Sequence, residues 1–348
     1  MAGVMAALKL PALVPAFGLM AALFLGSSPG LAQTSRAPDL PVAIEIQAQR
    51  ILSLDHLDST RRRFGALEFR GGIALTSRFG EFGGLSSIRV QPDGSTFIAA
   101  TDRGWWLRGR ITYEGKRPIG IAIPEMAAML GPDGRTLKAR GWYDTESIAQ
   151  DGGLLYVGIE RVNRILRFDY GKDGLLARGQ PIEVPPRMRT LPNNKGLEAL
   201  EFVPRNLPFG GTLIGIAERG LDRDGNNQGF LIGGPRPGLF AVKRTDDFDV
   251  SDMALLPSGD ALVLERKFSW TTGLFIRMRR ILFGDVRPGA LVNGSVLFEA
   301  DLRQSIDNME GLSVHRGPDG ETVLTMISDD NFSSLQRTLL LQFTLVGE

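Results

Sequence analysis

The sequence predicts an all-β protein, a single closed β-propeller with five blades. A hairpin plan with polar ends recurs five times, at a spacing of roughly 50 to 60 residues, which is at or slightly above the length of known propeller blades. The chain contains 43 glycines, which suit many tight turns better than long helices. Strand-like segments stand at both ends of the repeated region, where they can pair and close a ring.

The last copy shows the plan most clearly. A strand from Gly311 to His315 leads through a turn at 318–320 to a second strand from Thr322 to Ile327. In an antiparallel hairpin the start of the first strand lies beside the end of the second. Glu310 and the cluster 329–331 are therefore expected to meet at the end opposite the turn.

The other copies place acids at the same two positions. The first copy has Gly84 where others have Glu, and Asp252 of the fourth lies about one residue out of register. The acids at strand starts are Glu146, Glu198, Asp252 and Glu310, and those at strand ends are Asp102, Glu160, Glu218, Glu265 and Asp329. If the hairpins form a ring, all of these carboxylates face the same end of it.

Closure of the ring needs a strand from the other end of the chain. The last copy offers three clear strands, the third at 337–345, and an N-terminal strand would complete a four-stranded blade. A closed ring leaves no exposed sheet edge, whereas a linear solenoid would need caps that the sequence does not show. Six blades are the alternative, if part of the N-terminal stretch or the interval 105–141 builds another.

Length and composition narrow the class of protein. The chain has 348 residues and is 43% hydrophobic, which is ordinary for a globular protein with a large core. Lys and Arg number 40 against 39 Asp and Glu, so the basic bias expected of a nucleic-acid-binding protein is absent. There is no cysteine, hence neither a disulfide nor a lipoprotein attachment site. No linker divides 64–348, which we interpret as one propeller domain.

Residues 1–32 have the pattern of a signal peptide. Lys9 precedes an uncharged apolar run from Leu10 to Leu25, and the small residues Gly30 and Ala32 precede Gln33. An uncleaved membrane anchor is the alternative, because the run approaches the ~18 residues that can span a bilayer. We expect cleavage, a periplasmic or secreted protein, and no membrane span afterwards. Residues 33–63 are then a lead-in segment with a possible closing strand.

Several short motifs resemble a known family. They are the segments 195–200, 218–220, 308–312, and 328–332 followed by 336–340. Together they resemble the phytase-like domain family, described as having "esterase-like activity of phytase", over about residues 64–346. The resemblance implies a propeller whose recurrent Glu and Asp residues serve phosphoester or ester hydrolysis.

The acids predict a metal site. Nine carboxylates and the four arginines that follow strand-end acids leave an excess of five negative charges. Such an excess does not stay ionised and half-buried without a counter-charge. Oxygen-rich sites suit Ca²⁺ best, with Mg²⁺ or Mn²⁺ as alternatives. The expected metal ligands are Asp102, Glu146, Glu198, Glu310, Asp329 and Asn331, and Asn194 and Asn308 would add neutral oxygens.

The arginines predict a place for an anion. Neighbouring residues of a strand point to opposite faces. The side chains of an acid and of the Arg that follows it therefore do not both point to the axis unless the strand has ended. An inner ring of acids would bind a metal, an inner ring of arginines would bind phosphate, and a phosphoesterase uses both. We expect a small anionic substrate to be bound by Arg103, Arg161, Lys195, Arg219 and Arg266. The candidate general bases for water are Glu160, Glu218 and Glu265.

The resulting hypothesis is a monomeric, exported, metal-assisted hydrolase of phosphoesters or related esters. A non-catalytic propeller that binds a ligand or a protein, and a lactonase-like metal propeller, remain the alternatives. Any single Glu–Arg pair is also explained by a structural role in joining blades.

Other catalytic arrangements find little support. The two histidines, His56 and His315, fit surface or structural positions better than a catalytic base, and zinc is disfavoured without cysteine. The only Gly-x-Ser-x-Gly motif, at 26–30, lies inside the proposed signal peptide.

Overall fold

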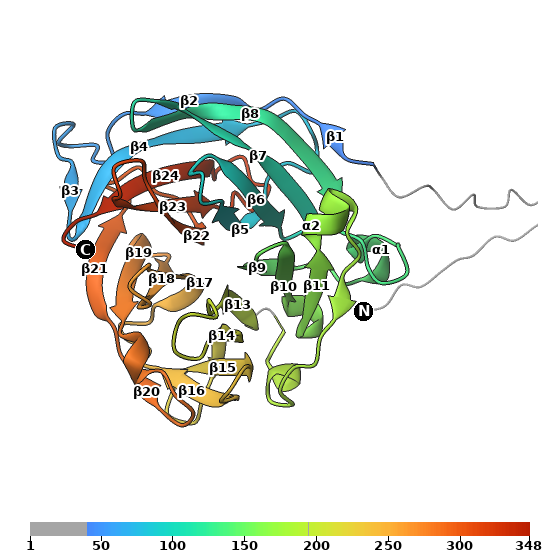
Figure 1. Cartoon of the computed structure of the whole chain (residues 1–348). Helices are drawn as coiled ribbons and strands as arrows, with labels where there is room; N and C mark the ends of the chain where they lie inside the picture. The colour runs from blue at the N-terminus through green and yellow to red at the C-terminus, as the bar shows by residue number, and fades with distance from the viewer. Residues whose placement is uncertain (1–39, 194) are drawn as a thin grey trace, which may run out of the picture. The chain divides into compact units, whose positions relative to one another are not determined.

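The computed structural model describes residues 40–193 and 195–348, and nearly all regular structure in these ranges is β-strand. Five sheets stand around a common axis, as Figure 1 shows. The predicted five-bladed propeller is confirmed, and the interval 105–141 adds strands to the first blade rather than a sixth blade. The proposed signal peptide (1–32), the start of the lead-in segment (33–39) and Asn194 lie outside the described residues.

Each of blades 1 to 4 begins at the axis and continues outward along the chain. Blade 1 consists, from the axis outward, of β5 (Leu85–Val90), β6 (Thr96–Thr101), β7 (Trp105–Glu114), β8 (Arg117–Ala128) and β1 (Val42–Ala43). Blade 2 consists of β9 (Thr145–Asp151), β10 (Leu154–Ile159), β11 (Arg164–Asp169) and β12 (Gln180–Pro181).

Blades 3 and 4 are joined by an exchanged strand. Blade 3 consists of β13 (Leu197–Phe202), β14 (Thr212–Leu221), β15 (Asn227–Gly233), β16 (Gly238–Val242) and β20 (Leu291–Val292). Blade 4 consists of β17 (Asp249–Leu255), β18 (Ala261–Ser269), β19 (Gly273–Ile281) and β21 (Ser295–Asp301). The chain leaves β19, pairs in parallel with β16 as β20, and returns to blade 4.

Blade 5 is built from both ends of the described chain. Its inner strands are β22 (Met309–Arg316), β23 (Thr322–Ser328) and β24 (Thr338–Leu345), and its outer strands are β4 (Leu67–Thr76) and β2 (Gln47–Ile51), with β3 (Arg63–Phe64) against β4. β4 pairs antiparallel with β24 along its whole length. The predicted closure by N- and C-terminal strands is therefore confirmed.

In residues 40–193 and 195–348, helical structure is confined to single turns between strands. These are α1 (Leu137–Arg140), α2 (Tyr170–Asp173), and the 3₁₀ turns η1 (Glu160–Val162), η2 (Gly174–Leu176), η3 (Met188–Thr190) and η4 (Phe283–Asp285). Within the described residues, none of these segments has the length and apolar character needed to cross a bilayer.

The hairpin turns follow from local chemistry. In blade 1 the Asp93 carboxylate accepts hydrogen bonds from the backbone amides of Ser95 and Thr96, each at 2.8 Å. Gly94 adopts a φ of +70°, which favours glycine because a side chain would be strained there. The turn thus closes with its own polar groups and leaves the opposite end of the hairpin free to carry the acids.

Apolar side chains hold neighbouring blades together. Each of the five hydrophobic clusters in the described chain is shared by two adjacent blades. Between blades 1 and 2, for example, Trp106 and Phe168 meet edge to face with ring centroids 5.2 Å apart. Burying a large apolar side chain contributes about 1.5–3 kcal/mol, so these clusters supply most of the stability that positions the axis.

A buried arginine crosses the axis. Arg89 of β5 donates hydrogen bonds to the carbonyl oxygens of Leu200 in blade 3 and Leu312 in blade 5, both at 2.8 Å. Its Nη1 also lies 3.2 Å from the Asp252 carboxylate in blade 4. One side chain therefore ties four inner strands together and fills the channel beyond their first residues.

Candidate metal centre and active site

The five inner strands share one irregularity at their starts. In each, the pairing with the second strand skips a residue, which is the signature of a β-bulge. Bulges redirect a side chain and often occur beside active sites. The skipped residues are Ser86, Glu146, Glu198, Ser251 and Glu310.

This alignment corrects two sequence assignments. Ser86, not Gly84, is the blade 1 counterpart of the skipped glutamates. In blade 4 the skipped residue is Ser251, not Asp252. Gly84 is needed because a Cβ there would lie 2.3 Å from Asp102 Oδ1, and its φ is +59°. Asp252 points instead to Arg89 and accepts a hydrogen bond from the Leu312 amide at 2.8 Å.

The ends of the second strands carry the matching position. In four blades the residue at this position donates its backbone amide to a carbonyl oxygen of the inner strand, two residues before the skipped residue. In blade 4, Arg266 pairs with Asp249, which also stands two residues before the skipped residue. The residues at this position are Asp102, Glu160, Glu218, Arg266 and Asp329. Blade 4 therefore carries a guanidinium where the other four blades carry a carboxylate.

The carboxylates meet at this end of the axis and are called the acidic ring below. Its members are Asp102, Asp144, Glu146, Glu160, Glu198, Glu218, Glu310 and Asp329. Oxygens of Asp144, Glu146 and Glu160 lie within 4.8 Å of one another, and so do those of Glu160, Glu198 and Glu218. These two groups share Glu160, come from blades 2 and 3, and could hold a metal ion.

Mutual repulsion acts on the ring members of blades 2 and 3, and also on Asp329 of blade 5, whose pKa burial and neighbouring carboxylates raise well above its ordinary value. Burial raises the pKa of Glu198 well above its ordinary value, and the neighbouring carboxylates, led by Glu146 and Glu218, raise it further. Burial and the carboxylates of Glu310, Asp144 and Glu160 do the same to the pKa of Glu146. Only 8% of Glu146 and 6% of Glu198 is exposed, so water screens little of this charge.

Two ring members have pKa values near neutrality. Burial raises the pKa of Glu160 to about 7, although the Gly196 amide donates a 2.5 Å hydrogen bond to its Oε1. Burial also raises the pKa of Asp102 to about 7, with Arg103 opposing the rise. Asp102 Oδ1 is buried and has no hydrogen-bond partner among the described residues.

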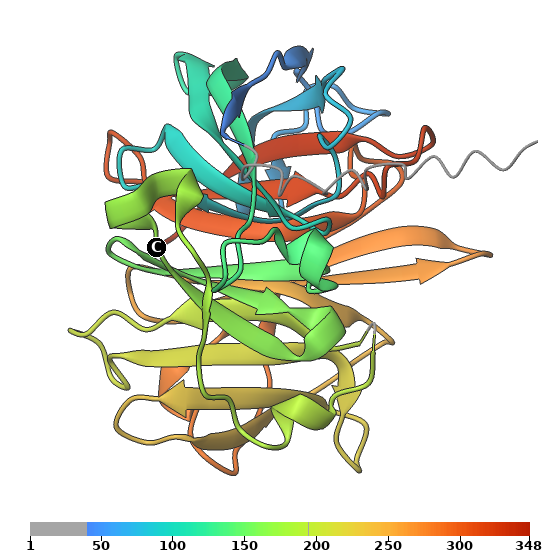
Figure 2. The same ribbon diagram turned by 90° about the vertical axis from the view of Figure 1, so that its right-hand side faces the viewer.

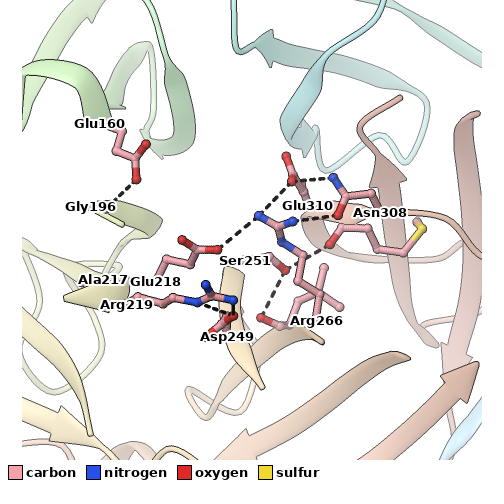
Figure 3. Close-up of polar contacts among 12 residues, drawn as sticks. Glu160, Gly196, Ala217, Glu218, Arg219, Asp249, Ser251, Arg266, Asn308 and Glu310 are labelled. Atoms are coloured by element: carbon pink, nitrogen blue, oxygen red, sulfur yellow. Dashed lines mark hydrogen bonds and ion pairs between the residues drawn. The ribbon is translucent and has the colours of Figure 1, made fainter. Parts of the chain in front are cut away.

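Arg266 forms ion pairs with two members of the ring, Glu218 of blade 3 and Glu310 of blade 5. Its Nη2 lies 3.3 Å from Glu218 Oε1 and 3.2 Å from Glu310 Oε1, and its Nη1 donates to Asn308 Oδ1 at 2.9 Å. Asn308 in turn donates to Glu310 Oε1 at 2.8 Å (Figure 3). Burial alone would lower the pKa of Arg266, but Glu310, Glu218 and Glu198 raise it overall, so it stays charged.

The other predicted substrate cations lie outside the ring. Arg219 pairs with Asp249, as Figure 3 shows. Arg103 stacks over the Phe332 ring at 3.2 Å, and Arg161 over the Tyr143 ring at 4.4 Å, measured to the ring centroids. Lys195 is exposed and precedes Gly196.

Among the predicted bases, Glu265 stands apart. It precedes the ring position by one residue, so its side chain turns to the opposite face of β18. There it forms an ion pair with Arg279 of β19 in which both side chains are 1% exposed. Glu160 and Glu218, in contrast, belong to the acidic ring.

Asn331 also lies apart from the ring oxygens. Its side-chain amide donates to Gln336 Oε1 at 3.2 Å, while its backbone amide bonds Asp329 Oδ1 at 2.6 Å. The adjacent Asp330 accepts a hydrogen bond from the Gly84 amide at 2.9 Å and so joins blade 5 to blade 1.

Asp144 belongs to the ring although sequence reasoning did not select it. Burial raises the pKa of Asp144, and Arg161 opposes the rise. Strand alternation could not have found it, because Asp144 precedes β9 with a φ of +73° and Glu146 is the skipped residue of the bulge. Asp249, which holds Arg219, was missed as well, because its partner comes from a different blade.

The donor set fits a hard divalent cation. The ring offers only carboxylate oxygens, the ligands that Ca²⁺ and Mg²⁺ prefer, and Asn308 adds an amide oxygen already bound to Arg266. The Oδ1 of Asp102, which has no partner among the described residues, and the raised pKa values of Glu146 and Glu198 fit a site that could hold a cation.

A β-propeller with buried carboxylates gathered at one end of its axis is the class of protein that fold and site define. The family model described as "Phytase-like: Esterase-like activity of phytase" matches residues 80–332. The chain therefore belongs to this family, as its motifs predicted. A comparison with curated proteins found no match.

The solved structures that match include a protein titled "Structure of U3-55K", at 11% identity and a TM-score of 0.37, covering 77% of this chain and 97% of that chain. Another is the glutaminyl cyclase of Myxococcus xanthus, at 12% identity and a TM-score of 0.37, covering 76% of this chain and 92% of that one. At these values neither carries information on function.

Proposed function

We propose that this protein is an exported, metal-assisted hydrolase of phosphoesters or related esters. The observation that supports the proposal is the pair of carboxylate groups that share Glu160, of which only Glu218 forms an ion pair with Arg266. Family membership favours ester chemistry in the same site. The signal-peptide pattern of residues 1–32 supports a periplasmic or secreted location.

Glu146 and Glu198 are the ligands we propose for the cation, with Ca²⁺ favoured and Mg²⁺ or Mn²⁺ as alternatives. Asp102, Glu310 and Asp329 complete the negative field around them. A bound cation would supply charge stabilisation for the oxygen of the phosphoryl or acyl group in the transition state.

Glu160 is the general base in this proposal. Its pKa of about 7 suits proton transfer at neutral pH, and Gly196 holds one of its oxygens in place. The carboxylate takes a proton from water as the water oxygen bonds to phosphorus or to the carbonyl carbon. The bond to the alcohol oxygen then breaks, and that oxygen takes the proton from Glu160. Arg266, with Arg161 and Lys195 farther out, would attract the anionic group.

The test combines cation binding and turnover. Calorimetry with Ca²⁺, Mg²⁺ and Mn²⁺ would be run beside hydrolysis assays on p-nitrophenyl phosphate, bis(p-nitrophenyl) phosphate and p-nitrophenyl acetate. We expect cation-dependent hydrolysis that falls by more than about 100-fold in Glu146→Gln and Glu198→Gln, since even indirect ligand contacts are worth 10- to 100-fold. Glu183→Gln, at an exposed glutamate outside the ring, should behave as wild type. Cation binding without turnover of any ester would instead assign a binding propeller.

A further inference from the structure

A cleft of about 660 Å³ opens beside Arg266. It lies between the tip of the β18–β19 hairpin and the loops of blade 5, and Phe268, Trp270, Leu302 and Leu335 contribute apolar walls. Trp270 is 95% exposed and Leu335 is 92% exposed, although both are large apolar side chains. Small-molecule pockets have volumes of roughly 300–1,000 Å³ and predominantly apolar linings, so size and composition suit a ligand.

The hairpin that carries Trp270 projects beyond its blade. β18 and β19 pair as far as Ser269 and Gly273, whereas pairing with β17 ends at Arg266 and pairing with β21 ends at Phe275. Figure 2 shows the orange hairpin reaching past its neighbours. Strand-end acids and this tip belong to the same end of the propeller, so the hairpin projects past the end that carries the acidic ring.

Arg266 and Asn308 connect the cleft to the ring. Both line the cleft, and both contact Glu310. A ligand with its apolar part against Trp270 would therefore have its polar end beside Arg266 and the carboxylates. Phe268 and Trp270 meet edge to face, with ring centroids 5.2 Å apart, and present aromatic surface that suits stacking with a third ring.

We infer that this cleft binds the aromatic part of an aryl ester, with the phosphate or carboxylic ester group placed at the acidic ring. The inference rests on the proposed hydrolase function for the reaction, but the binding preference stands on the cleft itself. The volume argues for a small molecule, and the arginine and asparagine on its inner wall argue for an anionic or ester group at one end. A second large cavity, of about 710 Å³, lies elsewhere and is lined mainly by charged residues such as Arg62, Glu68 and Glu321.

The experiment measures binding without turnover. The full mature chain would be titrated calorimetrically with 1-naphthylphosphonate and with methylphosphonate, each with and without Ca²⁺. We expect the naphthyl compound to bind at least about tenfold more tightly than the methyl compound. Trp270→Ala and Leu335→Ala should each remove most of that preference and leave methylphosphonate binding unchanged.

Leu57→Ala is the matched control, because Leu57 is 84% exposed and does not line the cleft. Equal affinity of wild type and Trp270→Ala for the naphthyl compound would overturn the inference, as would no binding of that compound. A concentration-dependent dimer that is lost in Trp270→Ala, without phosphonate binding, would assign the cleft to a second copy of the chain and also overturn it. Absence of ester hydrolysis together with naphthyl-selective binding would reject the catalytic proposal alone.

Discussion

The two sides of the acidic ring share one backbone plan and differ in charge. On the blade 2 and 3 side, Glu146, Glu160 and Glu198 gather with the further carboxylates Asp144 and Glu218, and the Gly196 amide bonds Glu160. On the blade 4 and 5 side, Glu310 meets the Arg266 guanidinium and the Asn308 amide. The difference arises at a single repeated position, where blade 4 has arginine instead of an acid.

This asymmetry shows where a cation is needed. Arg266 supplies the counter-charge for Glu310 and part of that for Glu218, so these two members are paired within the chain, whereas Asp329 of blade 5 keeps a pKa well above its ordinary value. The opposite side keeps buried carboxylates whose pKa values are raised by one another. A propeller with five acidic blades would lack this partner, whereas this one relieves the repulsion only where Arg266 reaches.

Removing the asymmetry should have the largest effect. Arg266→Glu would place a further carboxylate in the ring and leave Glu218 and Glu310 without their partner. We expect the free energy of unfolding without cations to fall by about 3 kcal/mol or more, as when one member of a buried ion pair is lost. Urea denaturation in the absence of cations measures this loss of stability. Lys172→Glu, at an exposed lysine, is the control, and an equal loss in both variants would contradict the comparison.

Neutralising one glutamate on each side should give effects of opposite sign. Without cations, Glu198→Gln removes a charge that burial and four carboxylates disfavour, so we expect the free energy of unfolding to rise by about 1 kcal/mol. Glu310→Gln weakens the contact with Arg266 and should lower it by about 1–2 kcal/mol. Urea denaturation of both variants and the wild type, each in the presence of a chelator, measures these differences in the free energy of unfolding. Destabilisation of similar size in both would show that the two sides do not differ.

Acidification should have the smallest effect. The pKa values of Asp102 and Glu160 are raised from ordinary values near 4 to about 7, so the folded protein binds more protons than the unfolded chain between these limits. Stability of the cation-free protein should therefore rise by about 1 kcal/mol as pH falls from 7.5 to 6.5. Saturating Ca²⁺ should abolish or reverse the trend. A cation-free stability that falls over the same interval would contradict the raised pKa values.

At lower pH the protonation of His315, at the opposite end of its strand from the acidic ring, opposes this rise in stability. Burial lowers the pKa of His315 to about 4, so the unfolded chain binds the extra proton between pH 6.5 and 4 and stability is lost there. Thermal melts below pH 6 separate the two contributions, because His315→Gln removes only the second.

The repeated hairpins could be predicted from the sequence because strands, turns and the alternation of apolar residues are local properties. Five blades and closure by both ends of the chain followed from this pattern, whereas the family followed from the resemblance of several short motifs. The placement of most acids at one end also followed, since register in an antiparallel hairpin connects the start of one strand to the end of the next.

Only the tertiary structure decided which charges share the axis. A one-residue bulge in each inner strand puts Arg266, not Glu265, at the ring position, and a shift of one residue turns a side chain to the other face. Arg103, Arg161 and Arg219 take their partners from side chains distant along the chain or on another element, which no local pattern specifies. The cleft beside Trp270 likewise exists because two separate blades meet there, and such a meeting depends on packing rather than on the order of residues.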